Sequence, residues 1–132
     1  MRSDLPAYRE LIATGFVGSL KRDVLIEARD DFEFLCHVRA RFAEASAAAA
    51  EVASECTAML ATDLVTAGLC DLRPWPPDET WKNEPAALSF DAVVFGANRC
   101  SEADRSISDL VLTVTDEGAA WVERYRRLVS EL

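Results

Sequence analysis

The sequence predicts an α+β fold that is mostly helical, with a small two- or three-stranded antiparallel sheet. Two stretches carry this prediction. Near the C-terminus, a β-rich run over 110–114 meets a helix start at Thr115, and the helix that follows has one apolar stripe. Earlier in the chain, a helix-like run closes at Gly68 and a strand-like segment over 69–73 follows it. We expect a helical insert between these last two strands.

The first thirty residues predict one helix and one ambiguous segment. Asp4 suits the N-cap of the first helix, with Pro6 tolerated in its first turn. Gly15 suits the position that closes this helix. Residues 16–29 fit either a short strand or a helix, and the sequence leaves the choice open.

The segment over 32–67 contains no glycine and no proline, so it predicts either one long helix or two. Asp30 or Asp31 is expected to cap it. We favour two helices with a break near Ser46, because a single helix of this length exceeds the usual globular range of roughly 8–20 residues. Its inward face would hold Phe32, Leu35, Val38 and Phe42.

The later elements follow from turn residues and helical spacing. Gly68 fits the left-handed position after a helix, and Leu69 can then pack back on the helix it closes. Residues 74–108 form the insert, with a helix expected over 86–97. The final helix is expected to place Trp121 in the core, on one face with Tyr125, Leu128 and Leu132.

Length and composition predict a single domain over residues 1–132, and half of these residues are apolar. No apolar run approaches the ~20 residues of a membrane span. The first ten residues also lack the apolar region of a secretory signal. We therefore expect a cytoplasmic protein that does not engage a membrane.

Negative charge is concentrated in the middle of the chain. The formal net charge is −9, and residues 46–108 carry four Lys/Arg against ten Asp/Glu. Such a field repels phosphate backbones and favours basic partners.

No residue pattern predicts an enzyme, a cofactor or a metal site. His37 is the only histidine and directly follows Cys36, and helix neighbours point about 100° apart, so the two cannot form a dyad. The four cysteines are scattered without a CxxC pair, which is typical of buried small hydrophobes rather than of zinc ligands or disulfides. The phosphate-binding loops GxGxxG and GxxxxGK[ST] and the motifs GxSxG and HExxH are absent.

A proline-rich acidic loop, RPWPPDETW, is the candidate partner-binding segment. Trp75 and Trp81 flank it, and tryptophan is enriched at interface hot spots. We predict that Trp75, Trp81, Asp78 and Glu79 contact a partner protein. Closure of the core edge by the two tryptophans is the alternative interpretation.

A helix closed by Gly68-Leu69 is followed by a short strand, and later an LT…G run leads into a last helix. This order of elements resembles the winged-helix class. The resemblance covers roughly residues 32–73 and 109–128, and the chain is also similar to uncharacterised bacterial winged-helix-like proteins with a Trp/Pro-containing segment between two strands. It implies DNA binding and transcriptional control. In that family the helix matching residues 47–67 lies in the major groove, and the segment matching 74–108 forms the wing.

The charge of the matching helix argues against DNA binding. Residues 47–67 contain no Lys or Arg and carry Glu51, Glu55 and Asp63, so this helix would repel the phosphates it must approach. Winged-helix domains also serve as protein-binding modules, and fold does not dictate function. We therefore expect a non-catalytic module that binds a protein with a basic surface.

Other functions and assemblies are left open. An immunity or antitoxin-like role, in which the chain masks a basic toxin surface, fits the charge. Assembly into a homodimer is left open as well. The runner-up is a transcriptional regulator with a basic surface built from Lys21, Arg22, Arg29, Arg39 and Arg41. An enzyme ranks third, and would need His37 to lie within hydrogen-bond reach of a cysteine.

Overall fold

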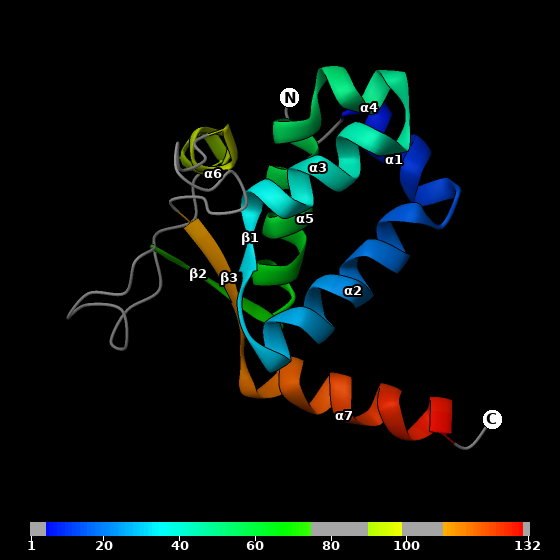
Figure 1. The fold of residues 1–132 in the computed structure, drawn as a ribbon, viewed down its shortest axis with the longest axis vertical. Coiled ribbons are helices and arrows are strands. Elements are labelled where there is room, and N and C mark those ends of the chain that lie inside the picture. The colour runs from blue at the N-terminus through cyan, green and yellow to red at the C-terminus, as the bar shows by residue number, and fades with distance from the viewer. Residues whose placement is uncertain (1–4, 75–89, 99–109, 131–132) are drawn as a thin grey trace.

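The computed structural model of the chain describes residues 5–74, 90–98 and 110–130 (Figure 1). Its elements are α1 (Pro6–Ala13), α2 (Phe16–Asp30), β1 (Glu33–Phe34), α3 (Leu35–Ala45), α4 (Ala47–Glu51), α5 (Ala53–Thr66), β2 (Cys70–Pro74), α6 (Phe90–Asn98), β3 (Leu110–Val114) and α7 (Asp116–Ser130). The predicted fold class is confirmed. The described chain is mostly helical, with a three-stranded antiparallel sheet and a helix between the last two strands.

The sheet has the strand order β1-β3-β2, with β3 in the centre. Leu112 of β3 lies opposite Glu33 of β1 and opposite Leu72 of β2, and both pairings are antiparallel. In Figure 1 the sheet lies at the left of the view, α2 runs from α1 down to α7, and α6 lies above the sheet.

The strand β1 was not expected from the sequence, and the expected helix cap at Asp30 or Asp31 is wrong. Asp31 lies at the C-terminal end of α2, and α3 begins only at Leu35, after Phe34 in an extended conformation. A two-residue strand is too short to show an alternating apolar pattern, so periodicity could not reveal it.

The two open segments are resolved as helices. Residues 16–29 belong to α2, which buries Leu20, Val24 and Ala28 along one face. The break near Ser46 is confirmed, because its hydroxyl accepts a hydrogen bond from the Ala49 N–H at 3.0 Å and caps α4. A second break at Val52, which separates α4 from α5, was not expected.

Glycine and proline set the remaining helix ends. The N-cap of α1 is Leu5 rather than Asp4, because Pro6 with its fixed φ is the first helical residue. Gly15 at φ 87° and Gly68 at φ 78° adopt the left-handed conformation expected of them. After Gly68, the Leu69 N–H donates to the Leu64 carbonyl at 3.0 Å, which completes the predicted helix stop.

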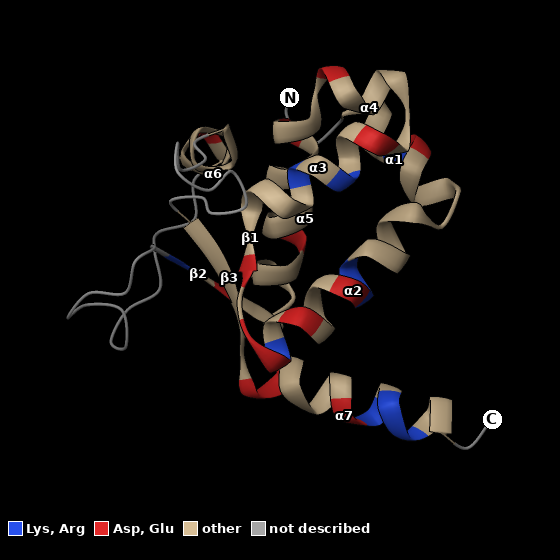
Figure 2. Ribbon diagram, in the orientation of Figure 1, with Lys and Arg blue, Asp and Glu red and all other residues tan. Residues whose placement is uncertain are grey.

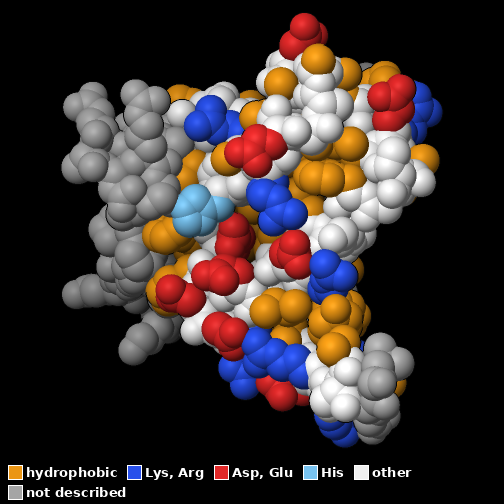
Figure 3. All heavy atoms as spheres, turned by 45° about the vertical axis from the view of Figure 1, so that its right-hand side comes forward, with side chains coloured by type: hydrophobic (Ala, Val, Ile, Leu, Met, Phe, Trp, Pro, Cys, Tyr) orange, Lys and Arg blue, Asp and Glu red, His pale blue; other side chains and the backbone are white. Residues whose placement is uncertain are grey.

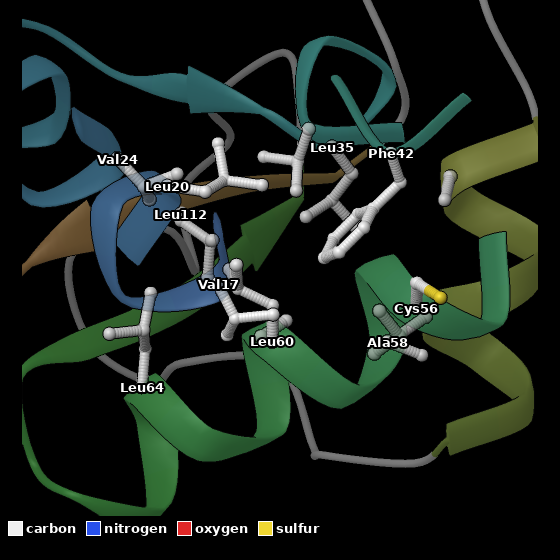
Figure 4. Packing of buried hydrophobic residues seen from close by; sticks show 14 of the residues in the cluster. Val17, Leu20, Val24, Leu35, Phe42, Cys56, Ala58, Leu60, Leu64 and Leu112 are labelled. Atoms are coloured by element: carbon white, nitrogen blue, oxygen red, sulfur yellow. The ribbon is translucent and has the colours of Figure 1, made fainter. Parts of the chain in front are cut away.

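The core lies between α2, α3, α5 and β3 (Figure 4). Leu20 of α2, Phe42 of α3, Leu60 of α5 and Leu112 of β3 are each at most 1% exposed. Burying one such side chain fully contributes about 1.5–3 kcal/mol to folding. The helices are therefore held in place mainly by these inward faces.

The last helix, α7, buries side chains only in its first half. Val122 is fully buried, whereas Trp121 packs against the core but is only partly buried. Leu128 is 63% exposed, so the predicted apolar face does not turn inward along its whole length. Figure 1 shows the reason, because the second half of α7 extends away from the other elements.

Thr115 joins the start of α7 to the end of α5. Its hydroxyl donates to the Gly68 carbonyl at 2.6 Å and accepts from the Gly118 N–H at 3.1 Å. Its own N–H donates to the Leu69 carbonyl at 3.1 Å. Gly118 lies so close to this corner that a Cβ there would collide with the Leu69 carbonyl oxygen and Val114.

We predict that Gly118→Ala lowers the free energy of unfolding by about 2–3 kcal/mol, because the backbone at Leu69 must shift to admit the methyl group. Urea denaturation measures the change. Gly18→Ala is the matched control, since this helical glycine of α2 has open space around its Cβ position. The control should stabilise the fold by about 0.5–1 kcal/mol. Equal effects of the two substitutions would contradict the close packing at Gly118.

Candidate interaction site

The four residues predicted to contact a partner lie outside the described residues. Trp75, Asp78, Glu79 and Trp81 all follow Pro74, where β2 ends. Their role therefore stays a prediction.

The helix expected to enter a DNA groove is largely inside the molecule. Residues 47–67 form α4 and α5, and α5 buries eight of its side chains. Asp63, one of the three carboxylates in residues 47–67, accepts a hydrogen bond from the Tyr8 hydroxyl at 2.6 Å and one from Lys21 Nζ at 3.1 Å. Asp63 thus ties α5 to α1 and α2. Burial and this hydrogen bond to Asp63 together raise the pKa of Tyr8.

One side of α5 is covered by α6. Ser54, Ala58 and Ala61 are buried and recur at helical spacing on α5, and these small residues allow a close approach. The Ser54 hydroxyl donates to Oδ1 of Asn98, the last residue of α6, at 2.5 Å. Val93 of α6 is fully buried. A duplex could reach this side of α5 only if α6 were displaced.

The basic residues of the regulator alternative are interleaved with carboxylates rather than gathered into one positive surface (Figure 2). Lys21 pairs with Asp63, Arg22 and Arg41 both pair with Asp23, and Arg29 pairs with Glu123. Arg39 lines a separate cavity of about 520 Å³ with residues of α3, α4, α5 and Asn98. In the same way, Arg126 of α7 pairs with Asp30 of α2 at 2.8 Å. Exposed pairs add little stability, but they neutralise the cations locally.

A hollow of about 370 Å³ lies between α2 and α3, with β1 at one end. Its lining is Leu20, Asp23, Val24 and Glu27 from α2, Glu33 from β1, and His37, Ala40 and Arg41 from α3. The spacing of four residues along each helix explains why these side chains face one another. In Figure 3 the single histidine marks the hollow, with acidic side chains gathered below it.

Glu33 is the most enclosed charged group of this hollow, at 8% exposure. It forms an ion pair with His37, whose Nδ1 is 3.8 Å from Oε1 and beyond hydrogen-bond range. Burial raises the pKa of Glu33 to about 7, and the charges of Glu27 and Asp23 act in the same direction. The charge of Arg41 opposes this rise without cancelling it.

The cysteines and the histidine that an enzyme would need differ in burial, and burial of the thiols disfavours their reaction. Cys36, Cys56 and Cys70 are buried and form no disulfide, whereas the His37 side chain is 48% exposed. Burial raises the pKa of Cys56 to about 11 and that of Cys70 to about 12, which disfavours the nucleophilic thiolate. Within residues 5–74, 90–98 and 110–130, no group of three or more His, Cys, Asp or Glu is arranged to hold a metal ion.

Comparison with known proteins identifies no relative: no family model, curated protein or solved structure matches the chain. None of the helices in the described ranges is both long and apolar enough to cross a membrane. The function is therefore inferred from the residues and their geometry alone.

The hollow is a site that sequence reasoning missed. A signal was present, because Asp23 and Glu27 are four residues apart, as are Glu33, His37 and Arg41. Regular spacing of charges usually marks a solvated helix face. The burial of Glu33 depends on β1 pairing with β3, and that pairing had no detectable signal in the sequence.

We predict that Glu33→Gln makes the protein more stable at pH 8 than the wild type. The pKa of Glu33 lies above its ordinary value of 4.5, so the native state holds a proton that the unfolded chain releases. The wild type therefore loses stability as the pH rises from about 5 to 7, by at most about 3 kcal/mol. Glutamine removes this loss.

Urea denaturation at pH 5 and pH 8 measures the difference between variant and wild type. We expect about 1–3 kcal/mol at pH 8 and a value near zero at pH 5. Glu10→Gln, on the exposed face of α1, controls for the removal of one negative charge and should follow the wild type. A Glu33→Gln effect of the same size at both pH values would contradict the raised pKa.

Proposed function

We propose that this chain is a non-catalytic protein-interaction module that binds a partner with a basic surface. The observation that supports this most directly is the face formed by α2, β1 and α3. It carries Asp23, Glu27 and Glu33 around a hollow, and Arg41 there is already engaged with Asp23. On a chain of net charge −9, such a face attracts basic proteins and repels phosphates.

The winged-helix resemblance is retained in this proposal as a scaffold. The order α2, β1, α3, α5, β2, β3, with β3 central in the sheet, supports the resemblance. The cover of α6 over α5 weighs against the DNA-binding role that the resemblance implies, because one side of that helix is occupied from within the chain. Masking the basic surface of a toxin, as an immunity protein or antitoxin does, is one process that this chemistry would serve.

The Trp75–Trp81 loop is proposed as the second part of the partner surface. It follows β2 directly and supplies two aromatic side chains beside Asp78 and Glu79. Tryptophan is enriched at interface hot spots, and the rim around such an anchor is polar.

We predict that the protein captures a partner with a basic surface from a lysate of its source cells, and that this binding weakens as salt is raised. Glu27→Lys should weaken capture at least tenfold. Glu10→Lys makes the same charge change at an exposed position on α1 and should leave capture unchanged. Quantitative mass spectrometry of the bound fraction, followed by titration of the purified partner, measures both effects.

Two outcomes would contradict the proposed function. One is equal weakening by Glu27→Lys and Glu10→Lys, which would mean that the net charge alone drives binding. The other is salt-sensitive retention of genomic DNA fragments in a gel-shift titration at low salt, which would favour the transcriptional regulator. If a folded Trp75→Ala, Trp81→Ala double variant still binds the partner, the loop has no part in the interface.

A further inference from the structure

We propose that the hollow between α2 and α3 is a subsite for one guanidinium or ammonium group on a basic side chain of the partner, with Glu33 and Glu27 as its anionic ligands. The proposal rests on the proposed function and assigns one step of recognition to named residues. It concerns a single side chain of the partner rather than the whole interface.

The lining of the hollow suits a long basic side chain. Leu20, Val24 and Ala40 provide apolar walls, and the hollow measures about 370 Å³. Arginine and lysine bury their methylene stems against apolar surface while the charged end meets polar groups. Carboxylates from two different elements, Glu27 on α2 and Glu33 on β1, line the same hollow.

The internal cation of the hollow is already engaged. Arg41 Nη2 lies 3.4 Å from Asp23 Oδ2, and Arg22 holds the other oxygen of Asp23 at 3.2 Å. No described residue donates a hydrogen bond to Glu33 or pairs with Glu27. The hollow therefore presents two carboxylates. Glu27 has no ion pair among the described residues, and Glu33 has one with the half-exposed His37, whose Nδ1 lies 3.8 Å away and carries a charge only when protonated.

Glu33 is the residue that points to a ligand. The residue is 8% exposed and its side chain 11%, and Glu33 lines the hollow without a hydrogen-bond donor from the described residues. A buried carboxyl group without a hydrogen-bond partner is costly, whether it is held protonated or ionised. A guanidinium placed in the hollow would supply N–H donors in a planar fork that matches the two carboxylate oxygens.

Binding of a cation here is coupled to the proton on Glu33. The groups that face Glu33 are Asp23 and Glu27 from α2 and His37 and Arg41 from α3, while Leu112 lies opposite it on β3. Because the pKa of Glu33 is about 7 without ligand, a bound cation would displace its proton. The affinity should therefore rise between pH 6 and pH 8.

Nuclear magnetic resonance titration with two short peptides tests the proposal. The first contains a single arginine, and the second contains citrulline, which has nearly the same shape without the charge. We expect saturable shifts with the arginine peptide alone, confined to amides of residues 20–27 and 33–41, with a dissociation constant on the order of 1 mM. The affinity should increase at least threefold from pH 6 to pH 8.

Variants separate Glu33 from its neighbours. Glu33→Gln should weaken the arginine peptide about tenfold and abolish the pH dependence, whereas His37→Gln should keep that dependence. Glu27→Gln, at an exposed position, should weaken binding without affecting the fold. Glu10→Gln should change nothing.

Three results would overturn the subsite: equal shifts with the citrulline peptide, unchanged affinity in Glu33→Gln, or shifts spread over all acidic surfaces. These results are distinguishable from failure of the proposed function. Suppose that Glu27→Lys abolishes partner capture while Glu33→Gln leaves both partner and peptide binding unchanged. This result would support the proposed protein-interaction function and contradict the proposed subsite.

Discussion

The burial of α5 is the constraint on which the rest of this structure depends. Cys56, Leu60 and Leu64 of this helix belong to the central core, and its small residues Ser54 and Ala58 are buried as well. A helix buried over such a wide arc cannot offer a broad surface to a large ligand. A large ligand would therefore have to contact other elements, since α6 also lies against α5.

With α5 inside, the charged residues are distributed over α2, α3 and α7. Ion pairs such as Arg29 with Glu123 and Arg126 with Asp30 join α7 to α2, and the paired carboxylates neutralise these arginine charges locally. Around the hollow between α2 and α3, Asp23, Glu27 and Glu33 face the single cation Arg41, and Glu33 is buried without a hydrogen-bond donor among the described residues. The same packing that hides the helix matched to DNA recognition thus leaves a face suited to cations.

Local signals in the sequence were sufficient for the elements that residue types control directly. Gly68 marked the end of α5, because a left-handed glycine acts within a few residues. The break near Ser46 was expected from the length of the segment, and the structure adds the N-cap hydrogen bond of Ser46. The strand β1 and the enclosure of Glu33 depend on pairing with β3, some eighty residues later in the chain, and no local pattern reports such a contact. The exposed end of α7 was missed for a related reason. An apolar stripe predicts a buried face but does not show how far the rest of the protein extends beneath it.

Native-state hydrogen exchange read by mass spectrometry tests the central claim most directly. If α6 is a permanent cover of α5, the amides of both helices exchange only through global unfolding, with a protection free energy equal to that from urea denaturation. Rapid exchange of residues 90–98, with α5 losing protection in the same opening while α2 and α3 stay protected, would contradict the account. It would mean that α6 detaches and exposes the helix that the winged-helix resemblance assigns to DNA.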